Sequence, residues 1–502
     1  MLPLTHPKIV IAGGGVAAIE ALLALRHVVG EQASVTLLAP ERSFVHRPSS
    51  VGGPFGLGGP GAVDLAALAR DQGAELVSAA LEAVDPARRV VKLGDGGELS
   101  YERLIVAVGA VPKPAIPGSV TFAGPAQAAA VVAVLDRVER REVRRLIFAV
   151  PREATWSLPV YELAIMAAVD LRDRGVANAT LGIVTPEPEP LRLFGAAAGA
   201  ALRAMLDARG ITLWTNTRPL ELRDGLLHVE PGGPLRADAV ISVPVLEGPA
   251  LAGLPADSRG FLPVDAHGLV VGAPGVYAAG DATAFPVKQG GLATQQADAV
   301  VDAVAADLGL LPDPEPFRPV LRGLLLTGGA PLYLRAELTG DTAPTAHALR
   351  GEASGRALWW PPGKVAGRYL APYLGTARPV DLGSEPLRDR AAATAATPAA
   401  DRGRPRPTAT RPTGSRRCSP ERTRRSATTA RRCTRSTPPP SPAGSLPRRV
   451  DREPRALAAR ALDAELGERR AALNYGRDMR GATQVVLHDR YARLHVARVH
   501  PH

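Results

Sequence analysis

The chain alternates apolar runs of strand length with longer stretches of helical character. The first apolar run, residues 8–12, ends in three glycines and passes into an Ala/Leu-rich stretch, which predicts a strand, a tight turn and a helix. Further runs typical of buried strands occur at residues 34–38, 101–108, 146–150, 181–185, 210–213 and 275–279. Strands that alternate with helices predict an α/β fold with parallel sheets.

The first glycine-rich turn has the spacing G-x-G-x-x-A from Gly13 to Ala18. Gly13 lets the chain turn, Gly15 leaves no Cβ in the way of a ligand, and Ala18 keeps the helix close to the strand. A diphosphate could then lie on the helix N-terminus, against the backbone of Val16 and Ala17. Similar turns also occur in α/β proteins that bind nothing, so the turn predicts a dinucleotide site only together with other motifs.

Two later strands end in the same kind of small-residue turn. One ends in Ala107, Val108 and Gly109, and the other ends in Gly280 and Asp281. In order and spacing, these stretches and the first turn resemble the marks of the FAD-dependent pyridine nucleotide-disulphide oxidoreductases, flavoproteins with two dinucleotide-binding domains. The resemblance implies that FAD binds here, that Asp281 accepts hydrogen bonds from its ribityl chain, and that the Gly109 turn lies beside it. The alternative is a fold that has kept its shape and lost its ligand.

The resemblance covers roughly residues 8–383 and implies a domain organisation. We expect an α/β fold of two Rossmann-like domains, the second inserted in the first, followed by a small C-terminal domain that caps the flavin and often mediates dimerisation. A homodimer is therefore expected. The expected boundaries are 1–117 and 239–316 for the FAD-binding domain, 118–238 for the NAD(P)-binding-like domain, 317–384 for the C-terminal domain, 385–450 for a disordered Arg/Pro-rich tail and 451–502 for a partly helical end.

Three residues after the second strand are further candidates for contact with FAD. Glu41 lies near the strand end, somewhat late for the acid that should hydrogen-bond the adenosine ribose. The segment around Arg47 and Pro48 resembles the part of these flavoproteins that folds back over the cofactor, and a guanidinium can pair with phosphate or stack on a ring. The prolines and glycines of residues 48–60 predict a long irregular loop. The alternatives are a solvated loop acid for Glu41 and a surface salt bridge for Arg47.

The second α/β unit lacks the glycine turn that a nicotinamide coenzyme would need. Residues 151–157 precede the helix that begins near Leu158, and none of them is glycine. Side chains and missing donors there block the contact of backbone with pyrophosphate. The stretch 157–162 resembles the corresponding turn of sulfide:quinone oxidoreductases, in which this domain is retained as a scaffold. We therefore expect NAD(P)H to bind weakly or not at all; the alternative is an unorthodox site at Glu187, which is placed to hold a ribose.

A later stretch predicts a second helix aimed at the flavin. Gly290 and Gly291 begin this helix and leave backbone N–H groups free, and its positive end, up to Leu292, would stabilise a reduced, anionic flavin. The Lys-x-Gly-Gly and Ala-x-x-Gln-Ala pattern resembles type II NADH dehydrogenases and sulfide:quinone oxidoreductases. By that resemblance Lys288 and Gln296 are the candidate catalytic residues. The alternative for Lys288 is a solvated loop cation.

The C-terminal domain concentrates several of the chain's scarce aromatic residues: Trp359, Trp360, Tyr369 and Tyr373. The pattern through residues 369–373 predicts an amphipathic helix. Such a helix could rest on a bilayer and collect quinone there, or it could be an ordinary core and interface helix. Only Lys364 and Arg368 supply basic charge nearby, which favours the second interpretation.

Charge and cysteine content narrow the classes of function. Residues 385–502 hold 26 Arg, no Lys and 11 acids, whereas the other 384 residues hold 34 basic and 38 acidic side chains. The net charge of +11 therefore comes from the tail, and because aromatic residues are not interleaved with its arginines, the pattern argues against nucleic acid as a partner. The only cysteines, Cys418 and Cys433, lie in that tail, which excludes a CxxC dithiol site in the body. The sequence suggests no metal site.

Apolar runs are too short for a membrane span, which needs roughly 18 to 20 residues, and residues 1–7 lack the features of a signal peptide. We therefore expect a cytoplasmic protein, with peripheral contact at the inner face of the membrane as an alternative. The motifs predict an FAD-dependent oxidoreductase that passes two electrons from a small-molecule donor to a quinone-like or other acceptor. Three alternatives stay open: an NAD(P)H dehydrogenase, a flavin-binding sensor without turnover, and a gene product whose end comes from a shifted reading frame.

Overall fold

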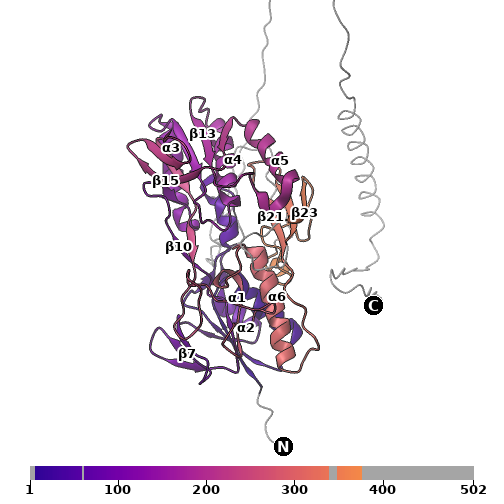
Figure 1. Ribbon diagram of the computed structural model, residues 1–502. Helices are drawn as coiled ribbons and strands as arrows, with labels where there is room; N and C mark the ends of the chain where they lie inside the picture. The colour runs from indigo at the N-terminus through magenta and orange to yellow at the C-terminus, as the bar shows by residue number, and fades with distance from the viewer. Residues whose placement is uncertain (1–5, 59–60, 339–347, 376–502) are drawn as a thin grey trace, which may run out of the picture. The chain divides into compact units, whose positions relative to one another are not determined.

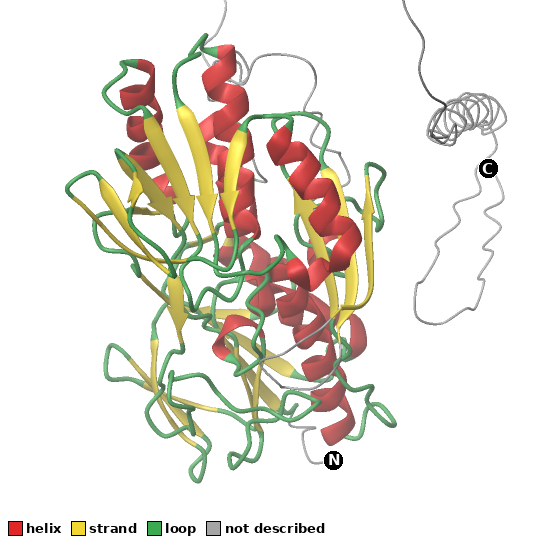
Figure 2. Ribbon diagram, turned by 45° about the horizontal axis from the view of Figure 1, so that its top comes forward, coloured by secondary structure: helices red, strands yellow, loops and turns green. Residues whose placement is uncertain are grey.

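The computed structural model describes residues 6–58, 61–338 and 348–375 (Figure 1). The chain divides into two compact parts, Met1–Arg404 and Pro405–His502, and all the described residues belong to the first part. The expectations for the tail, including its disorder and its two cysteines, fall outside the described residues. The described part holds parallel sheets covered by helices, which confirms the predicted α/β class (Figure 2).

The first parallel sheet is built from both ends of the described chain, in the order β20-β9-β1-β2-β5. Its strands are β1 (Lys8–Ala12), β2 (Ser34–Leu38), β5 (Glu75–Val77), β9 (Arg103–Val106) and β20 (Val276–Ala278). The helices α1 (Val16–Val28) and α6 (Gly290–Asp307) lie side by side and share one apolar cluster (Figure 1). A sheet assembled in this way is what an inserted second unit requires.

The second parallel sheet has the order β11-β18-β12-β13-β14. Its strands are β11 (Val120–Thr121), β12 (Arg145–Ala149), β13 (Thr180–Val184), β14 (Ile211–Trp214) and β18 (Ala239–Ser242). Its helices are α3 (Ala128–Glu139), α4 (Leu158–Asp173) and α5 (Gly195–Asp207). We expected the chain to return to the first domain at residue 239, but β18 pairs with β12 in the second sheet. That expectation was wrong, because an apolar strand pattern does not say which sheet the strand joins.

Short antiparallel elements surround the two parallel sheets. They are the pair β10 (Val111–Lys113) and β19 (Val245–Glu247), the pair β3 (Ser43–Phe44) and β4 (Val63–Asp64), the sheet of β6 (Leu81–Asp85), β7 (Val90–Leu93) and β8 (Glu98–Ser100), and the sheet of β15 (Arg218–Arg223), β16 (Leu226–Glu230) and β17 (Leu235–Arg236). The pair β10–β19 lies on the two connections between the parallel sheets. The helix α2 (Leu65–Asp71) follows β4.

The first and second parallel sheets, each with its helices, form what we call the first and second dinucleotide units. Four 3₁₀ helices complete the described part of these units: η1 (Arg47–Phe55), η2 (Pro125–Gln127), η3 (Arg192–Phe194) and η4 (Gly280–Ala282). The first of them lies where we expected a long irregular loop. Pro48 stands in its first turn, where a proline favours a helix start, and Gly56 ends it in the left-handed conformation. Glycines and prolines therefore mark the two ends of this helix as well as a loop.

The C-terminal region is an antiparallel sheet of β21 (Val320–Leu325), β22 (Leu332–Leu338) and β23 (Ala348–Ser354). A Cβ on Gly323 would lie 2.6 Å from the Phe194 ring, so this sheet packs closely against η3 of the second unit. The expected amphipathic helix is only the single turn α7 (Leu370–Tyr373). Trp359 packs edge-on against Tyr333 at 5.2 Å, whereas Trp360 is 76% exposed. Trp359 and Trp360 belong to an irregular segment, so the amphipathic helix expected near residues 369–373 is present only as this single turn.

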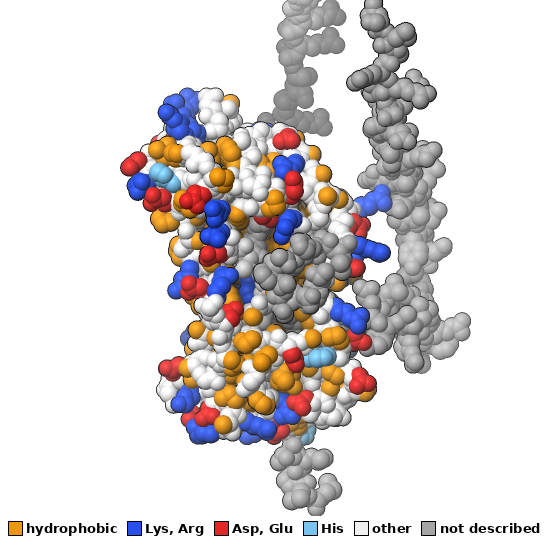
Figure 3. Space-filling view, in the orientation of Figure 1, with side chains coloured by type: hydrophobic (Ala, Val, Ile, Leu, Met, Phe, Trp, Pro, Cys, Tyr) orange, Lys and Arg blue, Asp and Glu red, His pale blue; other side chains and the backbone are white. Residues whose placement is uncertain are grey.

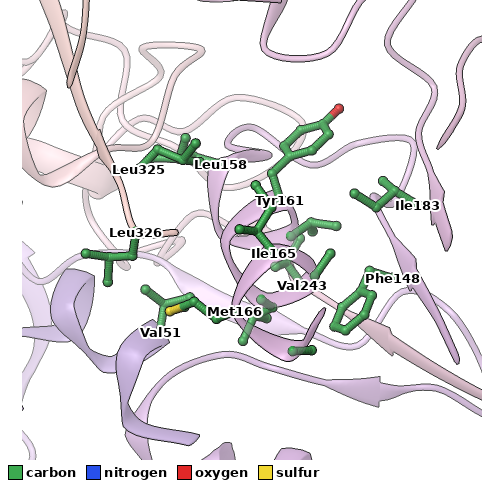
Figure 4. Packing of buried hydrophobic residues seen from close by; sticks show 14 of the residues in the cluster. Val51, Phe148, Leu158, Tyr161, Ile165, Met166, Ile183, Val243, Leu325 and Leu326 are labelled. Atoms are coloured by element: carbon green, nitrogen blue, oxygen red, sulfur yellow. The ribbon is translucent and has the colours of Figure 1, made fainter. Parts of the chain in front are cut away.

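One large apolar core joins the second unit, the C-terminal sheet and η1 (Figure 4). In it Val51 of η1 lies beside Met166 of α4, and Leu325 of β21 lies beside Leu158 of α4. Acidic and basic side chains are mixed on the face shown in Figure 3. Within the described ranges, no helix combines the length and the apolar character that a membrane span requires.

Candidate functional site

The residues predicted to hold a cofactor follow the carboxyl ends of neighbouring strands in the first sheet. The glycine turn follows β1, Glu41 follows β2, Gly109 follows β9 and Gly280 follows β20. All these strands run parallel, so their turns lie at one edge of the sheet. In doubly wound sheets this is the edge at which ligands bind.

The first turn is closed on one side and open on the other. Gly13 has a φ of +132°, and a Cβ there would lie 2.3 Å from the Ala107 carbonyl oxygen. A Cβ on Gly15 would meet no described atom within 4 Å, and the same holds for Gly109. Gly15 is also the N-cap of α1, so it offers no side chain to the amide donors of the first helical turn.

The other turns pack around this one. A Cβ on Gly280 would approach the Cβ of Ala17 to 3.0 Å and that of Ala293 to 3.4 Å, so η4 lies between α1 and α6. A Cβ on Gly14 would lie 3.2 Å from Glu41 Oε2. The structure thus brings together the glycine turn after β1, the Glu41 segment after β2 and the Gly280 turn after β20, although they are far apart in sequence.

The predicted cofactor-binding residues at the start of α1 and just after β9 differ in solvent exposure. Ala17, Ala18 and Ala107 are buried and form the floor. Val16 is half-buried, and Val108 is 37% exposed although it is a large apolar residue. Val108 is thus an exposed apolar side chain beside Gly15 and Gly109, which have free space next to them. A ligand bound at this edge of the sheet would cover it.

Asp281 and Arg47, the first residue of η1, lie close enough for their charges to interact. Burial raises the pKa of Asp281, and the positive charges of Lys288 and Arg47 act in the opposite direction. Arg47 is exposed at the start of η1, and the Cγ of Pro48 would lie 3.3 Å from a Cβ on Gly290. The segment expected to fold back over a cofactor therefore reaches the first residue of α6.

The N-terminus of α6 differs from the prediction. Gln289 is its N-cap, and its Oε1 accepts the Leu292 N–H at 2.9 Å. The amide of Leu292, which we expected near the flavin, is therefore bonded within the protein, whereas the free N–H groups expected at Gly290 and Gly291 stay a prediction. A Cβ on Gly291 would lie 3.0 Å from the same Gln289 oxygen. The glycines were visible in the sequence, but the return of a preceding side chain onto the helix was not.

Lys288 and Gln296 both hold the η4 turn. Gln296 Oε1 accepts the Gly280 N–H at 2.8 Å, and its Nε2 donates to Thr283 Oγ1 at 3.3 Å. Lys288 Nζ donates to the Thr283 carbonyl oxygen and lies 3.9 Å from the centre of the Phe261 ring. Burial lowers the pKa of Lys288 to about 8. Lys288 is thus not a solvated cation, and both side chains position the turn that carries Asp281.

A buried ion pair beside α6 was missed by the sequence reasoning. Lys364 Nζ donates to Glu162 Oε1, which also accepts the Leu326 N–H at 2.8 Å. Glu162 Oε2 is buried and has no hydrogen-bond partner in the described part of the chain. Burial raises the pKa of Glu162 and lowers that of Lys364. The next residue, Val365, lies against Gly290, which places the pair near the start of α6.

Two further buried groups belong to this region. Burial, and then the charge of Lys364, lower the pKa of His46 to about 4, and its Nδ1 is 2.8 Å from Ser49 Oγ. Glu20 of α1 accepts the N–H groups of Tyr369 and Leu370 at 2.9 and 2.7 Å. The segment of residues 364–370 is therefore fastened to α4 by one buried glutamate and to α1 by another. The sequence signal was a glutamate in an apolar helix face, at the fifth position of each helix.

Glu187 does follow β13, where an acid could hold a ribose, but its carboxylate is directed inward. Tyr161 donates its hydroxyl hydrogen to Glu187 Oε2 at 2.7 Å, and Ser157 donates to Oε1 at 3.1 Å. The hydrogen bonds that ribose hydroxyls would donate to this carboxylate are thus already donated by side chains of the protein.

Comparison with known proteins agrees with this geometry. The sequence profile of the family described as pyridine nucleotide-disulphide oxidoreductase matches residues 7–146 and 162–304. The chain belongs to this family. Membership confirms the predicted resemblance and indicates flavin-dependent oxidoreduction. The two matched stretches leave out residues 147–161, which include the turn before α4.

Curated relatives of this chain align over part of their length. Apoptosis-inducing factor 3 of Mus musculus is 30% identical over 222 residues, which are 42% of this chain and 34% of the mouse protein. NADH-dependent phenylglyoxylate dehydrogenase subunit epsilon of Aromatoleum evansii is 32% identical over 120 residues, which are 22% of this chain and 28% of that protein. The chain thus spans about a third or less of the curated relatives named here.

Solved structures of similar fold cover more of the chain. The sulfide:quinone oxidoreductase of Aquifex aeolicus superposes with a TM-score of 0.63 and 20% identity, over 69% of this chain and 86% of that one. A ferredoxin reductase of Rhodopseudomonas palustris superposes with a TM-score of 0.53 and 18% identity, over 69% and 91% of the two chains. At such identities the superpositions show the shared fold alone.

Proposed function

We propose that this protein is an FAD-dependent oxidoreductase that passes two electrons from a donor other than NAD(P)H to a quinone-like acceptor. The observation that carries the proposal is the meeting of four strand-end turns at one sheet edge, where Gly15 and Gly109 leave the space open. The residues fit an elongated dinucleotide, because the first turn of α1 offers amide donors and contains no acidic side chain.

Each part of FAD has groups of suitable chemistry at this edge. The backbone from Gly15 to Ala17 would bind the diphosphate, Glu41 would accept a ribose hydroxyl, and Asp281 would accept hydrogen bonds from the ribityl chain. Lys288 and Gln296 would keep Asp281 in place by holding η4. Bound FAD would supply the two-electron chemistry, and the protein would supply binding and orientation.

The buried pair of Glu162 and Lys364 is suited to holding a proton. Reduction of a quinone consumes two protons, so a site for this acceptor needs a protonated group within reach. Glu162 Oε2 is buried without a partner among the described residues, and burial favours the protonated form of this carboxyl. We therefore propose that Glu162 Oε2 takes up and releases this proton during turnover, while Lys364, paired with Oε1 in the resting protein, holds the carboxyl group in place.

Two observations support a donor other than NAD(P)H. The turn of the second unit has no glycine, and Glu187 is already hydrogen-bonded within the protein. The donor also differs from one that needs a protein thiol, because residues 1–417 contain no cysteine. The quinone-like acceptor rests on the family resemblance and on the acceptor named for the Aquifex aeolicus protein.

The visible spectrum of the purified full-length protein tests this function. We expect the absorption of oxidised flavin, release of FAD on heating, no bleaching on anaerobic mixing with NADH or NADPH, and rapid reoxidation of the photoreduced protein by a soluble quinone. Prompt bleaching by NADH would favour the NAD(P)H dehydrogenase alternative, and a reduced protein inert to quinones would favour the sensor. A well-folded, colourless protein that refuses added FAD would refute the proposal.

A matched pair of variants locates the flavin. Gly15→Glu places a carboxylate in the open space at the α1 N-terminus and should remove bound flavin without unfolding the protein. Glu153→Ala alters the corresponding turn of the second unit and should leave the flavin content unchanged. Equal flavin in both variants would show that the cofactor lies elsewhere.

A further inference from the structure

The second dinucleotide unit holds a carboxylate where a nicotinamide coenzyme would need a free site. Glu187 follows β13, the second strand of this unit in chain order, and its side chain turns toward the N-terminus of α4. Ser157 is the N-cap of α4, but its hydroxyl donates to Glu187 Oε1 instead of capping its own helix. The side chain of Glu187 thus bridges the two elements between which a coenzyme would lie.

Every contact of this carboxylate is a donor supplied by the protein. Oε2 accepts the hydroxyl of Tyr161 at 2.7 Å and that of Thr185 at 3.2 Å, and the backbone of Leu191 adds a further hydrogen bond. The ring of Tyr161 packs in the apolar core while its oxygen points away from that cluster (Figure 4). Burial, and then the charge of Glu187, raise the pKa of Tyr161 well above its usual value, so the phenol stays a donor.

The backbone around Glu187 is held as firmly as its side chain. The Glu187 carbonyl accepts the Asn216 N–H at 3.0 Å, and the Glu187 N–H donates to Thr185 Oγ1 at 3.2 Å. Leu191, whose backbone bonds the carboxylate, has a φ of +54°, which is a strained conformation for a bulky residue. A strained residue directed at a satisfied carboxylate indicates that the loop is built around this contact.

We propose that Glu187 is a specificity-determining residue: its carboxylate, held by the hydroxyls of Ser157 and Tyr161 beside the first turn of α4, is an internal anion that closes the second unit to nicotinamide coenzymes. The inference deepens the proposed function, because it explains at one residue why the donor is not NAD(P)H. A coenzyme pyrophosphate would have to lie at the start of α4, and a fixed negative charge beside this turn repels it. Trp156, which packs edge-on against Phe194 at 5.8 Å, fills the rest of this turn.

The test compares the wild type with Glu187→Ala, Glu187→Gln and the control Glu189→Ala in the full-length protein. Glu189 is an exposed acid two residues away that pairs with Arg203, so its loss changes the local charge without opening the α4 end. NADH is titrated into each protein, and the fluorescence of Trp156 and its neighbours reports binding. We expect both Glu187 variants to bind NADH at least about tenfold more tightly than the wild type and the Glu189 variant.

Thermal unfolding with added formate tests the internal anion directly. Formate can refill the space left in Glu187→Ala, so it should restore part of the lost unfolding temperature there and leave the wild type unchanged. The neutral Glu187→Gln variant keeps the side-chain volume and serves if the alanine variant does not fold.

Two results would overturn the assignment: the same NADH affinity in all four proteins, or an alanine variant that folds and does not respond to formate. Flavin content, measured in the same samples, separates the two proposals. If the protein is yellow and either result is found, only the role assigned to Glu187 is refuted. If the wild type is colourless, the proposed function is refuted, and the NADH titration and the unfolding data still test Glu187.

Discussion

The two dinucleotide units have the same strand–turn–helix beginning and opposite turns. In the first, Gly13 and Gly15 bring the backbone close to β9 and leave the α1 N-terminus without a side chain. In the second, Ser157 caps no helix donor because it is bonded to Glu187, and the turn before it carries six side chains and no glycine. The first unit leaves the start of its helix open for a ligand, and the second holds its own carboxylate, Glu187, beside the start of its helix.

A shared fold therefore does not settle what a unit binds. A helix N-terminus attracts an anion in either case, and the identity of that anion depends on a few side chains around the turn. The two units are more alike in the buried glutamate carried by the helix that follows each turn. The fifth residue of each helix, Glu20 in α1 and Glu162 in α4, is buried and holds the segment of residues 364–370.

The largest expected effect comes from Gly13, the residue that sets the first turn apart. Gly13→Val would force a β-branched residue to a φ of +132° with its Cβ 2.3 Å from the Ala107 carbonyl oxygen. Strain and overlap together should lower the free energy of unfolding by about 4–6 kcal/mol. Chemical denaturation of the purified variant measures this loss, or shows that it no longer folds.

Gly15→Ala is the control for this variant. Its Cβ would enter open space, so the free energy of unfolding should change by only about 0.5 kcal/mol, although bound flavin should decrease. If the two glycines prove equally tolerant of substitution, the contrast drawn between the closed and the open side of this turn is wrong.

The next effect separates the two helix glutamates. Lys364→Met removes the cation from Glu162 and leaves Glu20 untouched, because Glu20 is bonded to backbone N–H groups. Breaking a buried pair from one side should cost about 3 kcal/mol of unfolding free energy, measured in urea. The double variant Lys364→Met/Glu162→Gln should recover most of it. A loss that persists unchanged in the double variant would assign the effect to packing of the lysine chain.

The smallest effect is a pH dependence at the junction of the two units. The folded pKa of His46 is about 4, below its usual value of 6.5, so the unfolded chain binds the proton more readily between these values. The contribution of His46 to stability is complete above pH 6.5 and is lost as the pH falls toward 4. His46→Asn removes this dependence, so the wild type should lose about 2 kcal/mol relative to the variant between neutral pH and about pH 4.5.

Urea unfolding at both pH values checks this slope. Asn offers an amide in place of Nδ1, which preserves a partner for Ser49. Parallel pH profiles for the two proteins would mean that His46 is protonated as easily in the folded state as in the unfolded chain.

Much of the fold was predictable, because buried strands and their turns are local patterns. Residues 8–12 and 34–38 form strands with the expected bounds, and the turns at Gly15, Gly109 and Gly280 come to one edge as predicted. The failures share a cause. The sheet joined by β18 and the single turn of α7 both depend on contacts between segments, which periodicity does not encode.

The sequence by itself determined the order of strands and helices, the open glycine turn of the first unit and the absence of cysteine from residues 1–417. These follow from residue type and spacing along one stretch of chain. Only the tertiary structure decided where the buried charges go: Lys364 reaches Glu162 across about 200 positions, and Glu187 turns inward to Ser157 and Tyr161. A buried charge takes whichever partner the packed chain brings within hydrogen-bond distance, and that choice exists only after folding.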